Sequence, residues 1–176
     1  MLSTILFAIP LLGSAVAACT AQQRINYSSM VPYAYSQPDP VSTYNAFNAI
    51  PFGVPDHNGS CGTVIYPNGG GPVPVAVTGN GVVNFGTETR QVFSKVTGVY
   101  KDFGANGTTV IYTNVTLGVQ SLVPVPVTFS GQVYVDFNND CRISAVRAYA
   151  EIPTYINGVP VDIYQLLPIP KIPGVI

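Results

Sequence analysis

Four runs of alternating apolar and polar residues fill most of the second half of the sequence, over residues 96–103, 108–119, 123–137 and 141–151. A period of two is typical of a β-strand that buries one face and exposes the other. Short segments rich in Gly, Asn and Ser separate the runs, and the last of them is Asn138-Asn139-Asp140. Consecutive strands joined by short turns form an antiparallel meander, and strands of this length favour a strongly curved sheet.

One helix is predicted directly before the meander, over residues 86–96. Thr87 can cap its N-terminus, because a threonine hydroxyl accepts a hydrogen bond from a free backbone N–H of the first turn. Val92, Phe93 and Val96 give this segment an apolar side. The helix is therefore expected to pack against the sheet.

Proline interrupts the earlier segments. Between residues 20 and 58, the only window that predicts a helix is residues 41–49, where Pro40 suits the first turn. Residues 63–66 predict a short strand that ends at a Gly-rich turn. Residues 72–77 also alternate, but their prolines cannot donate to a β-ladder, so we expect an edge strand or an extended loop.

These patterns divide the sequence into four parts. Residues 1–18 read as a signal peptide, 19–58 as a proline-rich segment with one short helix, 59–152 as the folded core, and 153–176 as a proline-rich strap. The predicted fold class is α+β, a curved antiparallel sheet that forms a cone around one or two helices. The alternative is an all-β sandwich or barrel.

The N-terminus is typical of a cleavable secretory signal. Residues 1–12 are uncharged and strongly apolar and lead into small residues, so cleavage is expected near Ala17 or Ala18. The apolar stretch is about half of the roughly 20 residues that a membrane span needs, so no transmembrane segment is predicted. We therefore expect a secreted, extracellular protein. Residues 16–19 also resemble a bacterial lipobox, which would place a lipid on Cys19.

Export has two covalent consequences. Four Asn-x-Ser/Thr sequons, at Asn26, Asn58, Asn106 and Asn114, are expected N-glycosylation sites in a eukaryotic secretory route. In an oxidising compartment, Cys61 and Cys141 are the expected disulfide pair. Such a bridge would stabilise the fold by about 4 kcal/mol in the chain-entropy model. Cys19 is then expected to be free or capped.

The charge of the chain limits its partners. It has 7 Lys and Arg against 8 Asp and Glu, a formal net charge of −1, and 47% hydrophobic residues. Polyanion binding needs a basic surface, so nucleic acid is excluded as a partner. The apolar content is enough for a packed core.

Two segments carry a resemblance to a known family. The first is residues 86–93, in the predicted helix. The second is residues 132–151, which predict a strand, then an acidic turn, then a second strand that ends in Arg-x-Tyr-x-Glu. Together, residues 86–151 resemble the second half of the nuclear transport factor 2-like (NTF2-like) superfamily, in particular its SnoaL-like branch. The resemblance implies a cone-shaped sheet. The family begins with one or two long helices, whereas residues 20–58 predict at most one short helix.

The resemblance also implies a site. SnoaL-like proteins hold an acid–base group on their late strands inside the cone, where it acts on an apolar ring or polyketide-like substrate. Glu151 falls at the final acidic position, with Tyr149 and Arg147 on the same side of the strand by two-residue alternation. Tyr112 and Tyr134 are further pocket candidates. Alternatively, Arg147 and Glu151 face solvent or pair with each other.

Other chemistries find little support in the sequence. The sole histidine, His57, lies in a turn sequence with no nucleophile motif, and one histidine cannot build a zinc site. Asp136-x-Asn138-x-Asp140 imitates the start of a calcium loop, but Arg147 stands where the loop's last ligand should be, which favours a hairpin turn. We expect no metal and no cofactor.

Two functions remain open. In the preferred hypothesis, an apolar pocket binds a small hydrophobic molecule, or the outer sheet face meets a protein partner, without turnover. A homodimer through the sheet face is one such partner. The alternative is a SnoaL-like cyclase, isomerase or dehydratase that uses Glu151 as general acid or base. A buried carboxylate with a raised pKa would favour that alternative.

Overall fold

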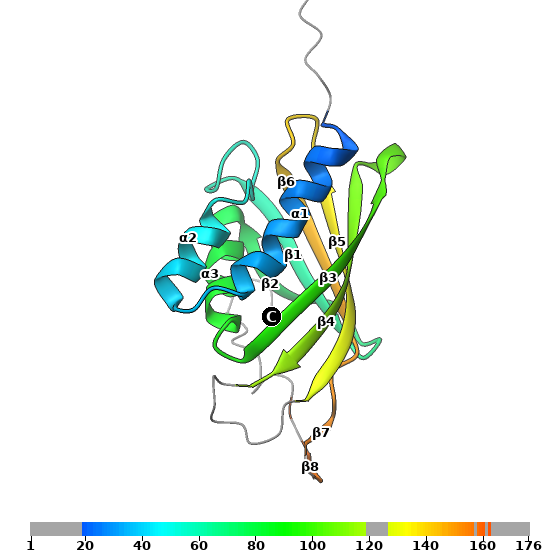
Figure 1. Cartoon of the computed structure of the whole chain (residues 1–176). Coiled ribbons are helices and arrows are strands. Elements are labelled where there is room, and N and C mark those ends of the chain that lie inside the picture. The colour runs from blue at the N-terminus through cyan, green and yellow to red at the C-terminus, as the bar shows by residue number, and fades with distance from the viewer. Residues whose placement is uncertain (1–18, 119–126, 157, 161, 163–176) are drawn as a thin grey trace, which may run out of the picture.

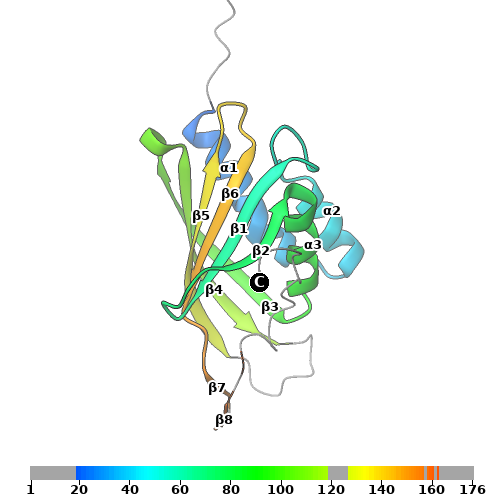
Figure 2. The same cartoon turned by 180° about the vertical axis from the view of Figure 1, so that it is seen from behind.

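The computed structural model describes residues 19–118, 127–156, 158–160 and 162. In this part of the chain, three helices pack on one face of a six-stranded, mostly antiparallel sheet (Figure 1). The turned view shows the other face of the sheet in front, with the helices behind or beside it (Figure 2). The predicted α+β cone is confirmed, and the all-β alternative is wrong.

The strands follow the order β2-β1-β6-β5-β4-β3 across the sheet. The parallel pair is β1 with β6, and every other neighbouring pair is antiparallel. The predicted meander is therefore confirmed over β3 to β6. The strand bounds are β1 Ser60–Pro67, β2 Val73–Thr78, β3 Phe93–Phe103, β4 Thr108–Leu117, β5 Thr128–Phe137 and β6 Ile143–Ala150, with a small separate ladder of β7 Tyr155–Ile156 and β8 Val159–Pro160.

Proline has the position in the sheet that its chemistry requires. Pro74 lies in β2, which is an edge strand of the sheet. A residue without an N–H is tolerated at an edge because one side of that strand has no neighbour. This confirms the edge-strand interpretation of residues 72–77.

The segment before β1 contains two helices, α1 Ala21–Tyr35 and α2 Pro40–Asn48. The second matches the prediction closely, since Asp39 caps it and Pro40 occupies its first turn. The expectation of a single short helix is wrong, because α1 is 15 residues long. Pro32 lies inside it, and a proline in the interior of a segment argues against a helix, so sequence reasoning missed it.

Local capping and tertiary contacts hold α1 in place. Thr20 and Gln23 form a capping box at its N-terminus, and the helix packs across β3 and β4. Arg24 and Ser28 are buried on its sheet-facing side. The same side of the helix carries apolar residues that pack on the core at helical spacing, namely Tyr27, Met30, Val31, Ala34 and Tyr35.

The third helix, α3 Gly79–Thr89, begins and ends earlier than predicted. Thr78 is its N-cap, whereas Thr87 lies within the helix and donates a side-chain hydrogen bond to the Val83 carbonyl at 2.8 Å. Phe93 and Val96 belong to β3. In that strand both side chains line the cavity, and Val92 lies in the turn before it.

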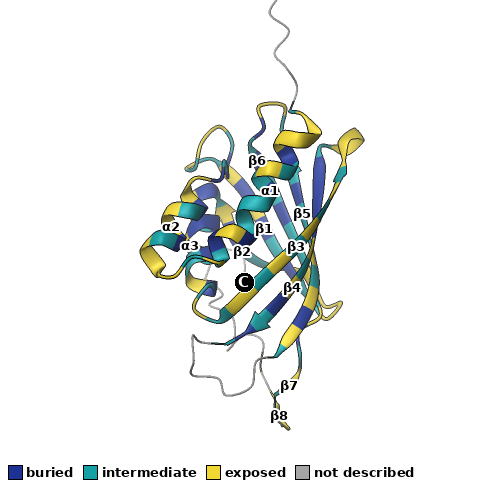
Figure 3. Ribbon diagram, viewed as in Figure 1, coloured by how far each residue is buried: buried dark blue, intermediate teal, exposed yellow. Residues whose placement is uncertain are grey.

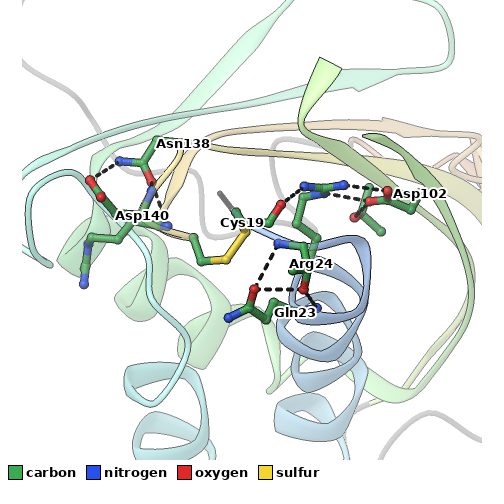
Figure 4. The surroundings of a disulfide bond; sticks show 10 residues. Cys19, Gln23, Arg24, Asp102, Asn138 and Asp140 are labelled. Atoms are coloured by element: carbon green, nitrogen blue, oxygen red, sulfur yellow. Dashed lines mark hydrogen bonds and ion pairs between the residues drawn. A yellow bond between two sulfur atoms is a disulfide. The ribbon is translucent and has the colours of Figure 1, made fainter. Parts of the chain in front are cut away.

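The disulfide joins Cys19 to Cys141, and the predicted Cys61–Cys141 pair is wrong (Figure 4). The bridge attaches Cys19, two residues before α1, to the turn between β5 and β6. Cys61 is buried as a free thiol on the inner face of β1. Because the disulfide uses the Cys19 sulfur, this structure does not accommodate a lipid on that atom.

A buried ion pair lies beside the disulfide (Figure 4). Both Arg24 and Asp102 are at least nine-tenths buried, and their two parallel contacts measure 2.8 and 2.7 Å. Thr109 donates a further hydrogen bond to Asp102, and Arg24 also donates to the Cys19 carbonyl oxygen. The guanidinium holds the pKa of Asp102 below its usual value, and Asp102 in turn raises the pKa of Arg24. These contacts link α1 to β3.

Candidate functional site

A cavity of about 150 Å³ lies between the concave face of the sheet and the helices. Buried positions concentrate where the helices meet this face (Figure 3). The lining comes from all three helices and from β1, β3, β4, β5 and β6. It consists of Val31, Tyr35, Phe47, Phe52, Thr63, Ile65, Val82, Phe85, Gly86, Phe93, Val96, Thr113, Val115, Phe129, Gly131, Val133, Val135, Val146, Ala148, Tyr149, Ala150 and Ile152.

The lining is almost entirely apolar. The polar side chains that the inner wall contributes are Thr63, Thr113 and Tyr35, while the Tyr149 ring belongs to the opposite face of β6. Among the described lining residues there is no Asp, Glu, His, Lys or Arg. An apolar cavity of about 150 Å³ suffices for a benzene-sized molecule and tends to stay dry.

Tyr35 supplies a fixed hydroxyl inside the cone. Its oxygen lies 2.9 Å from the Thr89 hydroxyl oxygen, and its ring packs edge-on against Phe47. Burial raises the pKa of Tyr35 to about 12. The phenol therefore stays neutral at physiological pH and cannot act as a general base there.

Gly86 brings α2 and α3 close together at the cavity. A Cβ at this position would lie 2.7 Å from the nearest carbon of the Phe47 ring. The missing side chain leaves room for the far end of the ring beside α3, so the close helix contact depends on glycine.

The structure places the predicted site residues on the other face of the sheet. Glu151 is exposed and lies with Tyr112, Tyr134 and Arg147 at an open hollow on the outer face. The expectation that Glu151 is buried inside the cone is therefore wrong. The alternation in β6 explains the error, because Val146, Ala148 and Ala150 point inward and their neighbours must point outward.

The outward-facing arginine does not pair with Glu151. Arg147 binds both carboxylate oxygens of Asp136 at 2.8 Å, which leaves the alternative Arg147–Glu151 pair unformed. The five predicted residues do lie near one another, as their strand positions indicated, but outside the cavity. Sequence reasoning missed the actual cavity residues, although the strictly apolar alternate positions of β5 and β6 mark that inner wall.

The remaining polar motifs have structural roles. His57 lies with Nε2 2.9 Å from the Ile50 carbonyl oxygen, outside the cavity lining. The Asn138 side chain accepts hydrogen bonds from the backbone N–H groups of Asp140 and Arg142. The acidic segment is thus a hairpin turn. The described residues contain no cluster of three potential metal ligands.

Two further features bear on export. All four sequon asparagines, Asn26, Asn58, Asn106 and Asn114, are exposed, so each is accessible to a glycan. The predicted signal peptide at residues 1–18 and most of the predicted strap lie outside the described residues. None of the described helices is long and apolar enough to cross a bilayer.

Comparison with solved structures identifies the fold. The cone of six strands and three helices is the NTF2-like fold, as the resemblance of residues 86–151 predicted. AusH from Aspergillus nidulans superimposes with a TM-score of 0.53 at 12% identity, over 78% of this chain and 89% of that one. No protein-family model and no curated protein sequence matches the chain.

Two other solved structures show weaker similarity. A SnoaL-like family protein from Agrobacterium tumefaciens has a TM-score of 0.45 at 15% identity, over 74% of this chain and 99% of that one. The pinacolase BvnE from Penicillium brevicompactum has a TM-score of 0.47 at 11% identity, over 78% of this chain and 86% of that one.

Proposed function

We propose that this protein binds a small, predominantly apolar molecule inside the cone and holds it without turnover. The observation that carries the proposal is the cavity of about 150 Å³ inside the cone, whose described lining is apolar and lacks charged side chains. Removing apolar surface from water stabilises such a complex by about 25 cal/mol per Å². The Tyr35 hydroxyl offers one fixed polar contact, which suits a ligand with a single oxygen or nitrogen.

The size of the cavity restricts the ligand. Drug-sized ligands occupy pockets of about 300–1,000 Å³, whereas this cavity has about 150 Å³. A single-ring molecule fits without rearrangement. A fused-ring molecule would require side chains such as Phe85 or Phe129 to move.

A catalytic function is the second candidate, and its support is the fold. SnoaL-like proteins include cyclases and isomerases that act on apolar rings, and this chain has their cone and an apolar interior. Such a reaction inside this cavity would not use Glu151, which lies on the other face. The hydroxyls of Tyr35, Thr63 and Thr113 are the groups within reach. With a pKa of about 12, Tyr35 could donate a hydrogen bond to a substrate oxygen but could not take up a proton.

Export is part of the proposal. A Cys19–Cys141 disulfide is what an oxidising compartment favours, and the sequence begins with a secretory signal pattern. We infer an extracellular protein with glycans on some of its four exposed sequons. A homodimer through the sheet face and the exclusion of nucleic acid stay predictions.

A matched pair of variants tests the binding site. Ala148 and Ala145 lie on the same strand, but only Ala148 lines the cavity. Toluene and p-cresol, added separately, should raise the melting temperature of the wild type, since a ligand at 100 times its Kd stabilises by about 2.7 kcal/mol. Ala148→Leu should abolish the shift by filling the cavity, and Ala145→Leu should retain it. An absent shift in the wild type, or an equal loss in both variants, would contradict the proposal.

The same samples separate binding from catalysis. Each probe is recovered after incubation and its mass and isomer composition are measured. The binding proposal predicts unchanged probe. A converted probe whose conversion is lost in Tyr35→Phe would favour the enzyme.

A further inference from the structure

A row of side chains crosses five strands on the outer face of the sheet, away from the cone cavity. The strand register aligns Tyr66, Tyr149, Gln132, Tyr112 and Val99, in that order, on β1, β6, β5, β4 and β3. Neighbouring strands are about 4.8 Å apart, so the row is roughly 19 Å long. It forms the floor of an open hollow of about 720 Å³. The described helices leave this face uncovered (Figure 2).

Polar side chains border the row on both sides. Arg147 and Tyr134 lie on one side, and Glu151, Ser130 and Asn114 lie on the other. The hollow therefore combines an aromatic floor with amide, hydroxyl and carboxylate groups along its edges.

The aromatic rings of the floor are held in place by one another. Tyr66 and Tyr149 stack at a centroid distance of 4.6 Å and an interplanar angle of 8°. Tyr134 meets Tyr149 edge-on at 5.5 Å, and the Arg147 guanidinium lies 5.6 Å above the Tyr134 ring. Such contacts fix side chains before a ligand arrives, which lowers the entropy cost of binding. Tyr112 has no ring partner among the described residues and is 41% exposed, so its ring is open to a ligand.

Several hydrogen-bonding groups in the hollow are unused. The hydroxyls of Tyr66, Tyr112 and Tyr149 make no hydrogen bond to the described residues, and neither do the side chains of Asn114 and Glu151. Because Arg147 is neutralised by Asp136, Glu151 is the one uncompensated charge among the described lining residues. The hollow therefore does not attract polyanions, and a purely apolar ligand would cover polar groups without satisfying them.

We propose that this outer hollow binds a neutral oligosaccharide that lies across the strands along the Tyr66–Val99 row. A sugar ring presents C–H groups on its faces and hydroxyls at its rim. The C–H faces pack on tyrosine rings, while the hydroxyls donate to Glu151 and exchange hydrogen bonds with Asn114 and Gln132. The row is long enough for several sugar units. This site is independent of the ligand cavity inside the cone.

The test uses the full domain made in an oxidising bacterial compartment, so that Asn114, itself a sequon at the hollow, carries no glycan. Linear pentasaccharides of glucose, N-acetylglucosamine and mannose are titrated separately by isothermal calorimetry. At least one should bind saturably. Tyr112→Ala should weaken that binding by about tenfold or more, as expected for a central aromatic contact. The matched control is Tyr33→Ala, which removes a 60% exposed tyrosine from α1 and should leave the affinity unchanged.

Melting temperatures of both variants show whether they are folded, and sedimentation measures their oligomeric state. The proposal is overturned if none of the three pentasaccharides binds, or if Tyr112→Ala and Tyr33→Ala bind equally well. It is also overturned if the wild type is a dimer that Tyr112→Ala converts to a monomer, because the hollow is then an interface between two copies.

Discussion

Loss of the Cys19–Cys141 disulfide should destabilise this domain far more than replacement of the free cysteine, Cys61. The bridged residues are separated by 122 positions. In the chain-entropy model, cross-linking a loop of this length stabilises the folded state by about 5 kcal/mol. For a domain of this size, 1 kcal/mol corresponds to about 2–4 °C in melting temperature. We therefore expect a drop of roughly 10–20 °C for Cys19→Ser/Cys141→Ser relative to the oxidised wild type.

The matched control is Cys61→Ala. Cys61 is fully buried and makes no disulfide, so its replacement removes one sulfur atom from the core. A small core truncation of this kind costs about 1 kcal/mol. Urea unfolding without reductant, followed by unfolding with dithiothreitol, separates the two effects. Reduction should lower the stability of the wild type and of Cys61→Ala, and leave the double serine variant unchanged.

Thiol titration of the unfolded, unreduced chains provides an independent readout. The wild type should have one reactive thiol and Cys61→Ala should have none. Two thiols in Cys61→Ala, together with unchanged stability in a Cys19→Ser variant, would show that Cys61 pairs with Cys141 and would refute the reasoning.

Three further predictions concern stability. Asp102→Ala should lower the free energy of unfolding, measured in urea, by about 3–5 kcal/mol, because it leaves the Arg24 guanidinium buried without its partner. Asp136→Ala removes the partner of the more exposed Arg147 and should lower the free energy of unfolding by at most about 1 kcal/mol. Equal losses in the two variants would contradict this prediction. Arg24 lowers the pKa of Asp102 in the folded state, so the ionised carboxylate stabilises the fold. This stabilisation is fully present above the pKa of Asp in the unfolded chain, about 4, and is lost as the pH falls through the lower pKa of the folded state. The wild type should therefore lose more stability on acidification than Asp102→Asn, and parallel pH profiles would count against the pair. Gly86→Ala should destabilise the folded domain by about 1–3 kcal/mol, because the new Cβ meets the Phe47 ring. This cost should exceed the gain from the higher helix propensity of alanine. A more stable variant would show that α2 can move away from α3.

The meander could be predicted from sequence because each of its strands and turns is determined by residues that are close together in the chain. Alternation and turn residues fix β3 to β6, and Asp39 with Pro40 fixes the start of α2. By contrast, α1 depends on contacts between distant residues, above all Arg24 with Asp102, which are 78 positions apart. The interior Pro32 and the buried Arg24 obscured the apolar side of this helix in the sequence.

The five predicted site residues lie near one another, but on the face of the sheet opposite the cavity. Two-residue alternation showed that Arg147, Tyr149 and Glu151 share one side of β6. The choice of side came from the family resemblance, which put the acidic residue inside the cone. The burial pattern of Val146, Ala148 and Ala150 argues for the opposite choice, because the apolar members of an alternating strand face the core. The disulfide partner likewise depended on the position of α1, which the sequence did not reveal.

The most direct test of the central claim is a methyl NMR titration of the oxidised domain with p-cresol. Ile65, Val115, Val133 and Val135 line the cone cavity, whereas Val77 and Val99 are more than half exposed on other surfaces. We predict saturable shifts of the four interior methyl signals, with Val77 and Val99 unchanged. Shifts confined to Val77 and Val99, or no interior shift up to the solubility limit of p-cresol, would show that the cone does not bind a small apolar molecule.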